Sequence, residues 1–210
     1  MLSNFTTFFI VFAASYPPHP SVPANTVPEF IAYAKANPGK VNMASAGTGA
    51  GTHLAGELFK TMAGVNLIHV PYRSNGPALV ALLGGQAEVL FPSLPSSIEY
   101  IRTGKLRGLA VTSAMRWEAM PDLPTVGEFV PGYEISLWYG VGAPKGTPTE
   151  VIDKLNRAIN EILADPKAKG RLADLGGTVL AGSPADFGKY IADETEKWGK
   201  VIQTLNIKAD

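Results

Sequence analysis

The chain has 210 residues, of which 46% are hydrophobic and 17% charged, and its formal net charge is zero. This composition suits one or two globular domains with a sizeable core and argues against a disordered chain. The neutral charge also argues against non-specific nucleic-acid binding, which depends on excess positive charge. The sequence contains no cysteine, which excludes disulfides, thiol catalysis and cysteine-ligated metals, and its 3 histidines are too scattered to predict a metal site.

The N-terminal residues contain an apolar run from Phe5 to Ala14. Its length fits the apolar part of a signal peptide, but the first basic residue of the chain is Lys35, so the positive segment that precedes such a run is missing. We therefore favour a buried strand around residues 8–12 over a signal peptide. No run reaches the roughly 20 apolar residues that span a bilayer, so stable membrane insertion is not expected.

Strand and helix patterns then alternate. Prolines between residues 16 and 23 predict an extended connector, and a capping box at Thr26 and Glu29 predicts a helix that ends near residue 38. Further strands are expected at residues 41–44, 67–70, 87–91 and 106–112, and further helices at residues 52–63, 76–83 and 96–102. Short helices between strands predict an α/β fold with a mostly parallel sheet and right-handed crossovers.

The remainder of the chain predicts two strands and two longer helices. A strand is expected at residues 135–143, and a second capping box, Thr147 to Glu150, predicts the helix after it. The inner face of that helix is predicted to hold Val151, Leu155, Ala158, Ile159 and Ile162. A strand at residues 178–180 precedes the last helix, capped by Ser183 to Asp186, whose inner face is predicted to hold Phe187, Tyr190, Ile191, Trp198 and Ile202.

The proline-rich connector and the strand at 135–143 indicate a domain boundary. Residues 24–134 are predicted to form one complete α/β lobe, and residues 1–23 and 135–210 to form part of a second lobe. A lobe inserted between the two ends of a chain is typical of clamshell binding proteins.

A glycine-rich turn from Ser45 to His53 follows the strand at 41–44. The helix after it is predicted to hold Leu54, Ala55, Leu58 and Met62 on its inner face. Unpaired N–H groups at a helix start, the positive end of the helix dipole and hydroxyl side chains make the turn a candidate site for a small anion. Between residues 30 and 87 one acid stands against four basic residues, which favours a carboxylate ligand.

Other interpretations of the turn are weaker or remain open. A dinucleotide fingerprint needs a third glycine where Thr52 stands, and a phosphate loop needs a lysine after Gly51. A plain tight turn, whose glycines only permit the bend, stays open as an alternative. Ser45 is flanked by alanines, so the Gly-x-Ser-x-Gly elbow of hydrolases is absent, and no close acid–base pair stands out. Neither an enzyme nor a cofactor is expected.

In open α/β sheets, ligands bind where the strands end. The loops at residues 45–52, 71–76 and 92–96 are therefore predicted to lie on one rim. The residues predicted to contact the ligand are Ser45, Ala46, Gly47, Thr48, Gly51, Thr52, His53, Arg73 and Ser93. His53 more often has a packing or capping role at such a position, and an exposed Arg73 is often only solvated. We expect His69 in the core and Trp138 either at the cleft or in hinge packing.

The sequence resembles one bacterial family from about residue 21 to the C-terminus. The matching segments are residues 22–24, 31–40, 45–47, 53–59, 69–73, 82–86, 104–107, 122–126 and 143–148. In these motifs and their order the chain is similar to the substrate-binding proteins of tripartite tricarboxylate transporters, the Bug family. The resemblance implies a periplasmic clamshell of the type II class that delivers a small carboxylate (a di- or tricarboxylate, an acidic amino acid or an aromatic acid) to membrane permease subunits. It also implies that the turn at 45–53 holds a ligand carboxylate.

Two departures from the family pattern are evident. The opening third of the pattern, including a Pro-Gly-Gly loop that holds the ligand from the other side, has no counterpart, so the chain resembles an N-terminally truncated member. The loop after Phe91 often carries Asp-Asn in the family, whereas here it carries Pro92 and Ser93. A binding-deficient paralogue with no independent transport role is therefore the alternative function.

Overall fold

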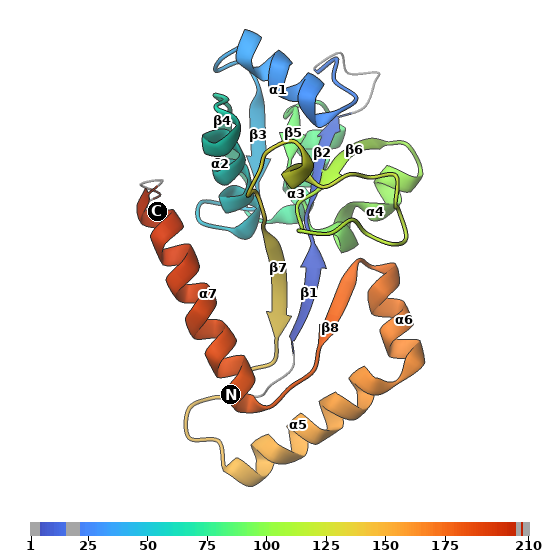
Figure 1. Ribbon diagram of the computed structural model, residues 1–210, viewed down its shortest axis with the longest axis vertical. Helices are drawn as coiled ribbons and strands as arrows, with labels where there is room; N and C mark the ends of the chain where they lie inside the picture. The colour runs from blue at the N-terminus through green and yellow to red at the C-terminus, as the bar shows by residue number, and fades with distance from the viewer. Residues whose placement is uncertain (1–4, 16–21, 205–206, 208–210) are drawn as a thin grey trace. The chain divides into compact units, whose positions relative to one another are not determined.

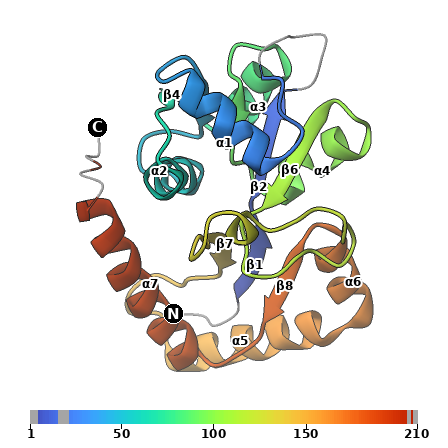
Figure 2. The ribbon, with the colours of Figure 1, turned by 45° about the horizontal axis from the view of Figure 1, so that its top comes forward.

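The computed structural model describes residues 5–15, 22–204 and 207, apart from the side chains of residues 5–9 and 15. The chain divides into two compact units, shown in Figures 1 and 2. The larger unit holds residues 9–15 and 22–136, and the smaller unit holds residues 5–8 and 137–204. The predicted division differs from this one at its N-terminal side, because the strand at residues 11–15 pairs within the larger unit.

A five-stranded sheet forms the centre of the larger unit. In spatial order its strands are β4 (Ile68–Pro71), β3 (Asn42–Ser45), β5 (Val89–Leu90), β2 (Val11–Ser15) and β6 (Leu106–Val111). β3 runs parallel to β4 and β5, whereas β2 runs antiparallel to β5 and β6. The predicted α/β fold with a mostly parallel sheet is confirmed, and the apolar N-terminal run supplies its antiparallel strand (Figure 1).

Short helices connect the strands of this sheet. They are α1 (Val27–Ala36), α2 (Gly51–Ala63), α3 (Asn75–Leu83) and α4 (Leu94–Arg102), with the 3-10 helix η1 (Val126–Glu128) after β6. α1 begins at its predicted cap, where the Thr26 hydroxyl accepts a hydrogen bond from the Glu29 N–H at 3.3 Å. α2 ends at Gly64, whose left-handed conformation is readily adopted by a residue without a β-carbon.

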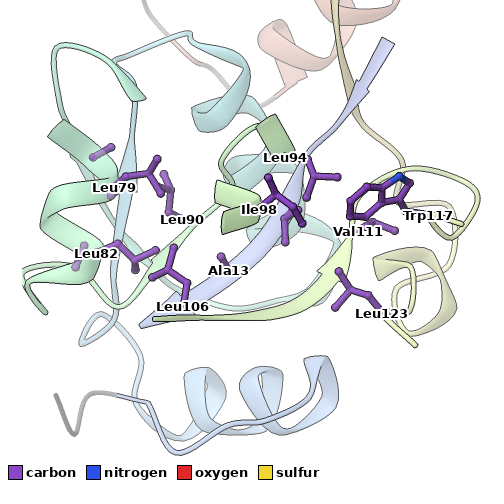
Figure 3. Close-up of a cluster of buried hydrophobic side chains, with 14 residues drawn as sticks. Ala13, Leu79, Leu82, Leu90, Leu94, Ile98, Leu106, Val111, Trp117 and Leu123 are labelled. Carbon is purple, nitrogen blue, oxygen red and sulfur yellow. The ribbon is translucent and has the colours of Figure 1, made fainter. Parts of the chain in front are cut away.

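Two apolar clusters cover the two faces of the sheet. On one face the Phe12 ring contacts Phe30, Phe59 and Phe91 at centroid distances of 4.9, 4.9 and 4.8 Å. On the other face Ala13 lies in a cluster of leucine, valine and isoleucine side chains from α3, α4, β5 and β6 (Figure 3). Since successive strand residues point to opposite faces, β2 contributes to both clusters, and the sheet is buried on both sides.

The inner face of α2 differs from the prediction. Leu54, Ala55 and Phe59 are buried, but Leu58 is only half-buried and Met62 is 38% exposed. The helix packs most closely at Gly56, where an added β-carbon would lie 2.0 Å from the Met43 sulfur on β3. Ala55, Gly56 and Phe59 are thus buried against the sheet, whereas Met62, in the last turn of the helix, is not.

The smaller unit contains a three-stranded sheet and three helices. The strands lie in the order β7 (Ser136–Gly140), β1 (Phe5–Phe9) and β8 (Gly177–Leu180), with β1 antiparallel to β8. The helices are α5 (Thr149–Ala164), α6 (Pro166–Asp174) and α7 (Pro184–Thr204). α5 and α6 separate at Asp165, where the sequence predicts a break, and the Asp165 carboxylate accepts from the N–H groups of Lys167 and Ala168.

Two predictions for α5 are wrong. The face predicted to be buried is not, because Val151, Leu155 and Ile162 are 44%, 41% and 61% exposed. The predicted capping box is also missing, since the Thr147 hydroxyl donates to the Pro144 carbonyl at 2.9 Å and the helix starts without a side-chain cap. The predicted cap of α7 is confirmed, because the Asp186 carboxylate accepts from the Ser183 N–H at 2.8 Å. Within the described parts of the chain, none of the helices is long and apolar enough to cross a bilayer.

Candidate functional site

The glycine-rich turn lies where the sequence places it, between β3 and the start of α2. β3 pairs in parallel with β4 on one side and β5 on the other. The loops that follow these three neighbouring strands therefore lie along one edge of the larger unit's sheet. This is the position at which open α/β sheets bind ligands.

The turn depends on glycine at two positions. Gly47 has a φ of 122° and Gly49 a φ of 77°, values that side chains with a β-carbon rarely adopt. A β-carbon on Gly47 would also lie 3.4 Å from the Tyr72 carbonyl oxygen, in the loop after β4. The backbone of the turn thus approaches the neighbouring loop closely, and the glycines do more than permit a bend.

Several N–H groups of the turn already have partners within the protein. The Ala46 N–H donates to the Thr52 hydroxyl at 2.8 Å, and the Gly47 N–H donates to the Ser45 hydroxyl at 3.1 Å. The Gly49 N–H donates to Nδ1 of His53 at 3.0 Å. These contacts hold the turn in shape, so Ser45, Thr52 and His53 have structural partners in addition to the ligand role predicted for them.

Other N–H groups of the turn are unpaired. Within the described residues, no acceptor lies within hydrogen-bonding reach of the N–H groups of Thr48, Gly51 and Thr52. Gly51 and Thr52 are the first two residues of α2, at the positive end of its dipole, and the Thr48 side chain is half-buried beside them. Of the N–H groups in the predicted anion site at residues 45–53, those of residues 48, 51 and 52 are therefore the ones available to a ligand.

His53 and Ser45, at the two ends of the turn, form a cluster with His69 on β4. The rings of His53 and His69 stack with centroids 3.7 Å apart and an interplanar angle of 11°. Nε2 of His69 lies 2.6 Å from the Ser45 hydroxyl oxygen, and Ser45 is fully buried. His69 was expected in the core, but it is half-buried and belongs to this cluster. The parallel pairing of β3 with β4 places Met43 beside His69 and Ser45 beside Pro71. The sequence alone does not reveal this register.

Glu57 lies beside this cluster, and neighbouring side chains balance its negative charge. Oε1 of Glu57 lies 3.6 Å from Nε2 of His53 and 2.7 Å from Nζ of Lys60. Burial acts to raise the pKa of Glu57, but the interactions with His53 and Lys60 outweigh it and lower that pKa to about 2. Glu57 is therefore ionised near neutral pH and paired with Lys60, so it opposes an anion at the turn less than a lone carboxylate would.

The other two loops contribute polar side chains. Arg73, after β4, is exposed. Ser93, after β5, is 8% exposed and is the N-cap residue of α4. The Asn75 amide nitrogen donates to the Ser96 hydroxyl at 2.6 Å and lies 3.4 Å from the Ser93 hydroxyl. The sequence analysis placed the loops of Asn75 and Ser96 on the rim but named only Ser93 as a ligand contact. Ser96 follows Ser93 on the first turn of α4, whereas only the fold brings Asn75 beside them.

Trp138 has a packing role in the smaller unit. Its ring lies edge-on to Phe187 and Tyr190, at centroid distances of 5.8 and 5.6 Å.

The side chains that the structure describes include no group of three histidines or acids arranged to hold a metal ion. The chemistry on the rim is hydrogen-bond donation from backbone, hydroxyl, amide and guanidinium groups.

Comparison with known proteins gives one consistent family. The model of the tripartite tricarboxylate transporter family receptor matches residues 8–207. A UPF0065 protein from the tcbD-tcbE intergenic region of Pseudomonas sp. (strain P51) is 37% identical over 207 residues, which cover 96% of this chain and 62% of that protein. The chain thus spans about three-fifths of this relative's length.

Solved structures agree with the sequence match. Rpa4515 of R. palustris with adipate superposes with a TM-score of 0.92 at 35% identity, covering 97% of this chain and 67% of that one. MatC (Rpa3494) of Rhodopseudomonas palustris with bound malate superposes with a TM-score of 0.81 at 28% identity, covering 94% of this chain and 67% of that one. The fold is that of the periplasmic binding proteins of this group. The chain therefore belongs to the family of tripartite tricarboxylate transporter receptors.

Proposed function

We propose that the protein is a periplasmic solute-binding protein that captures a small carboxylate, with a dicarboxylate as the favoured ligand, for the permease subunits of a tripartite tricarboxylate transporter. Family membership supports the transport role, and the adipate and malate bound by the two related structures are both dicarboxylates. The observation that carries the proposal is the set of unpaired N–H groups of Thr48, Gly51 and Thr52 at the start of α2.

In this proposal one ligand carboxylate lies at the N-terminus of α2. It accepts hydrogen bonds from these N–H groups and from the Thr48 hydroxyl. Hydrogen bonds to a carboxylate are charge-assisted and about twice as strong as neutral ones. Arg73, on the adjacent loop, pairs with the second carboxylate, and Ser93 with its neighbours Asn75 and Ser96 supplies neutral polar contacts. Nothing in this arrangement requires a catalytic group or a cofactor.

Gly51 offers a sharp test, because it is the first residue of α2 and its N–H is unpaired. Proline is well tolerated at this helix position, and the extended conformation of Ala50 (φ −65°, ψ 155°) suits a residue before proline. Gly51→Pro therefore deletes one donor and retains the helix, while Gly51→Ala retains the donor. Calorimetry with adipate and malate should show an affinity loss of about tenfold or more for Gly51→Pro relative to Gly51→Ala. Equal affinities for the two variants would contradict carboxylate binding at this turn.

Arg73 tests the dicarboxylate preference separately. Arg73→Gln should weaken binding of a dicarboxylate but leave a matched monocarboxylate unaffected, because only the second carboxylate pairs with the guanidinium. Lys40→Gln is the control, since Lys40 precedes β3 and so lies at the opposite end of that strand from the turn. If no carboxylate binds the unmodified chain at millimolar concentration, the alternative of a binding-deficient paralogue is favoured instead.

A further inference from the structure

We infer that His53 positions the carboxylate-binding turn and does not touch the ligand. A proton on its Nδ1 atom then releases the turn. This inference rests on the proposed function. The side chain is 5% exposed, and both of its ring nitrogens face protein groups. Nδ1 accepts a hydrogen bond from the Gly49 N–H and Nε2 faces Glu57, so both nitrogens are engaged by protein groups and neither is directed at a ligand.

The hydrogen bond from Gly49 fixes the protonation state of His53. Nδ1 accepts the Gly49 N–H at 3.0 Å, so Nδ1 carries no hydrogen and the single ring hydrogen lies on Nε2. Nε2 faces Oε1 of Glu57 at 3.6 Å, which agrees with a hydrogen on that atom. The neutral ring in this tautomer therefore joins the turn to α2, and Gly49 lies between Thr48 and Gly51, two of the unpaired donors.

A second proton on the ring conflicts with this arrangement. Nδ1–H and the Gly49 N–H would both be donors pointing at one another, so the Gly49 N–H must turn away. Gly49 is exposed, and a glycine adopts its φ of 77° and many other backbone conformations without strain. The peptide group of Gly49 can therefore rotate away from the ring. The donors of Thr48 and Gly51 lose their alignment when it does, and carboxylate affinity falls.

Titratable and charged groups face the ring from the neighbouring elements. His69, on β4, stacks on His53 with ring centroids 3.7 Å apart. Glu57, on α2, faces Nε2 of His53 at 3.6 Å, and Lys60 pairs with that carboxylate at 2.7 Å. Tyr133 donates its hydroxyl to the Ala55 carbonyl of the same helix and stays neutral, because burial raises its pKa.

Two substitutions separate positioning from packing. His53→Asn retains an acceptor at the place of Nδ1 but removes the ring and its titration. His53→Phe retains a ring that stacks on His69 but removes the acceptor. If His53 positions the turn, the asparagine variant retains most of the affinity for adipate or malate and the phenylalanine variant loses it. If His53 only packs, the order reverses, and the inference is overturned.

The dependence of binding on pH supplies a further readout. Between about pH 7.5 and about pH 6, the unmodified chain should lose roughly threefold or more in affinity for malate relative to His53→Asn at the same pH, a comparison in which protonation of the ligand itself cancels. A rise in affinity on acidification would show that the His53 cation contacts the ligand, and would overturn the inference. Retention of the pH dependence by His53→Asn would place the titrating group elsewhere and would overturn it too.

Nuclear magnetic resonance of the unliganded 210-residue chain tests the hydrogen bond without any ligand. The Gly49 amide proton and the His53 ring nitrogens should titrate together over the same pH range. The Gly39 amide is the matched control, since it donates to the Asn66 carbonyl at 3.1 Å in the same unit and should not move. Joint titration with no carboxylate binding would support the positioning contact while contradicting the proposed function. Independent titration of Gly49 and His53 would overturn the inference even if a carboxylate binds.

Discussion

The two units differ in how completely their apolar side chains are buried. In the larger unit apolar clusters cover both faces of the sheet, and Phe12, Leu90 and many other side chains are fully buried. In the smaller unit Phe187 is the one large apolar side chain that is buried, among those that the structure describes. α5 has as regular an apolar face as any helix of the larger unit, yet it exposes that face.

This difference separates the formation of an apolar helix face from the burial of that face. Helical periodicity determines which side chains share a face of a helix, and this depends on the sequence of that helix alone. Burial of the face requires a second surface, which other segments must supply. α2 lies on the five-stranded sheet and buries its face, whereas within its own unit α5 does not. We therefore expect equal substitutions to have unequal effects in the two units.

A matched pair of leucines tests the comparison most directly. Leu90→Ala, in the centre of the larger unit, should lower the free energy of unfolding by about 2–5 kcal/mol, because it leaves a cavity among well-packed neighbours. Leu155→Ala, on the exposed face of α5, should change it by no more than about 0.5–1 kcal/mol. Urea unfolding measures both, with Trp117 fluorescence reporting on the larger unit and the fluorescence of Trp138 and Trp198 reporting on the smaller. Equal losses would show that the α5 face is buried in solution.

Acid should destabilise the larger unit through Glu57. The pKa of Glu57 is lowered from 4.5 to about 2, so its stabilising contribution is present above pH 4.5 and is lost as the pH falls towards 2. Glu57→Gln should cost the unit about 1–2 kcal/mol near neutral pH, because solvent partly screens the contacts of a half-buried carboxylate, and should flatten the pH dependence of stability below about pH 4.5. Unfolding monitored by Trp117 fluorescence at a series of pH values checks both effects.

Glu128 is the control for this prediction. The Arg116 guanidinium and the Thr125 N–H lower the pKa of Glu128 to about 2 as well, but that ion pair is exposed to solvent. Solvent screens exposed pairs, so Glu128→Gln should change stability far less than Glu57→Gln. A similar loss for both variants would contradict the view that burial beside His53 makes the Glu57 contacts strong.

Two glycines compare packing in the two units. A β-carbon on Gly56 would lie 2.0 Å from the Met43 sulfur, and one on Gly140 would lie 2.1 Å from the Phe187 ring. Gly56→Ala should destabilise the larger unit by about 1–2 kcal/mol, since overpacking costs more than the gain in helix propensity, about 1 kcal/mol, returns. Gly140→Ala should cost less, because Phe187 has fewer buried neighbours that hold it in place. Thermal unfolding of the two variants gives the order, and a larger loss at Gly140 would contradict it.

The same distinction explains what the sequence could predict. The alternation of strands and helices, the cap at Thr26 and the position of the glycine-rich turn follow from local residue patterns, and the structure confirms them. The burial of α5 could not be predicted, because it depends on segments distant in the chain. The exposure of Met62 in the last turn of α2 has the same cause, since the helix pattern does not show whether another segment covers that turn.

The candidate site was predictable to a similar extent. The glycines, the hydroxyl side chains and the scarcity of acids pointed to an anion-binding turn. Which N–H groups are unpaired could not be read from the sequence, because the Thr52 hydroxyl and the His53 ring return to the turn and occupy two donors. The contact between His53 and His69 joins residues from a helix and a strand, and no local pattern indicates it.

The smallest expected effect on stability is at Ile162, which is 61% exposed on α5. Ile162→Gln should change the free energy of unfolding by less than about 0.5 kcal/mol, because the side chain gives up little contact when it is replaced. Its effect on association should be measurable, since exposed apolar patches promote self-association and dye binding. Light scattering and ANS fluorescence should both decrease in the variant, whereas Lys154→Gln on the same helix, which removes no apolar surface, should leave them unchanged. If Ile162→Gln instead destabilises the chain as Leu90→Ala does, another surface covers the α5 face in solution, and the contrast between the two units disappears.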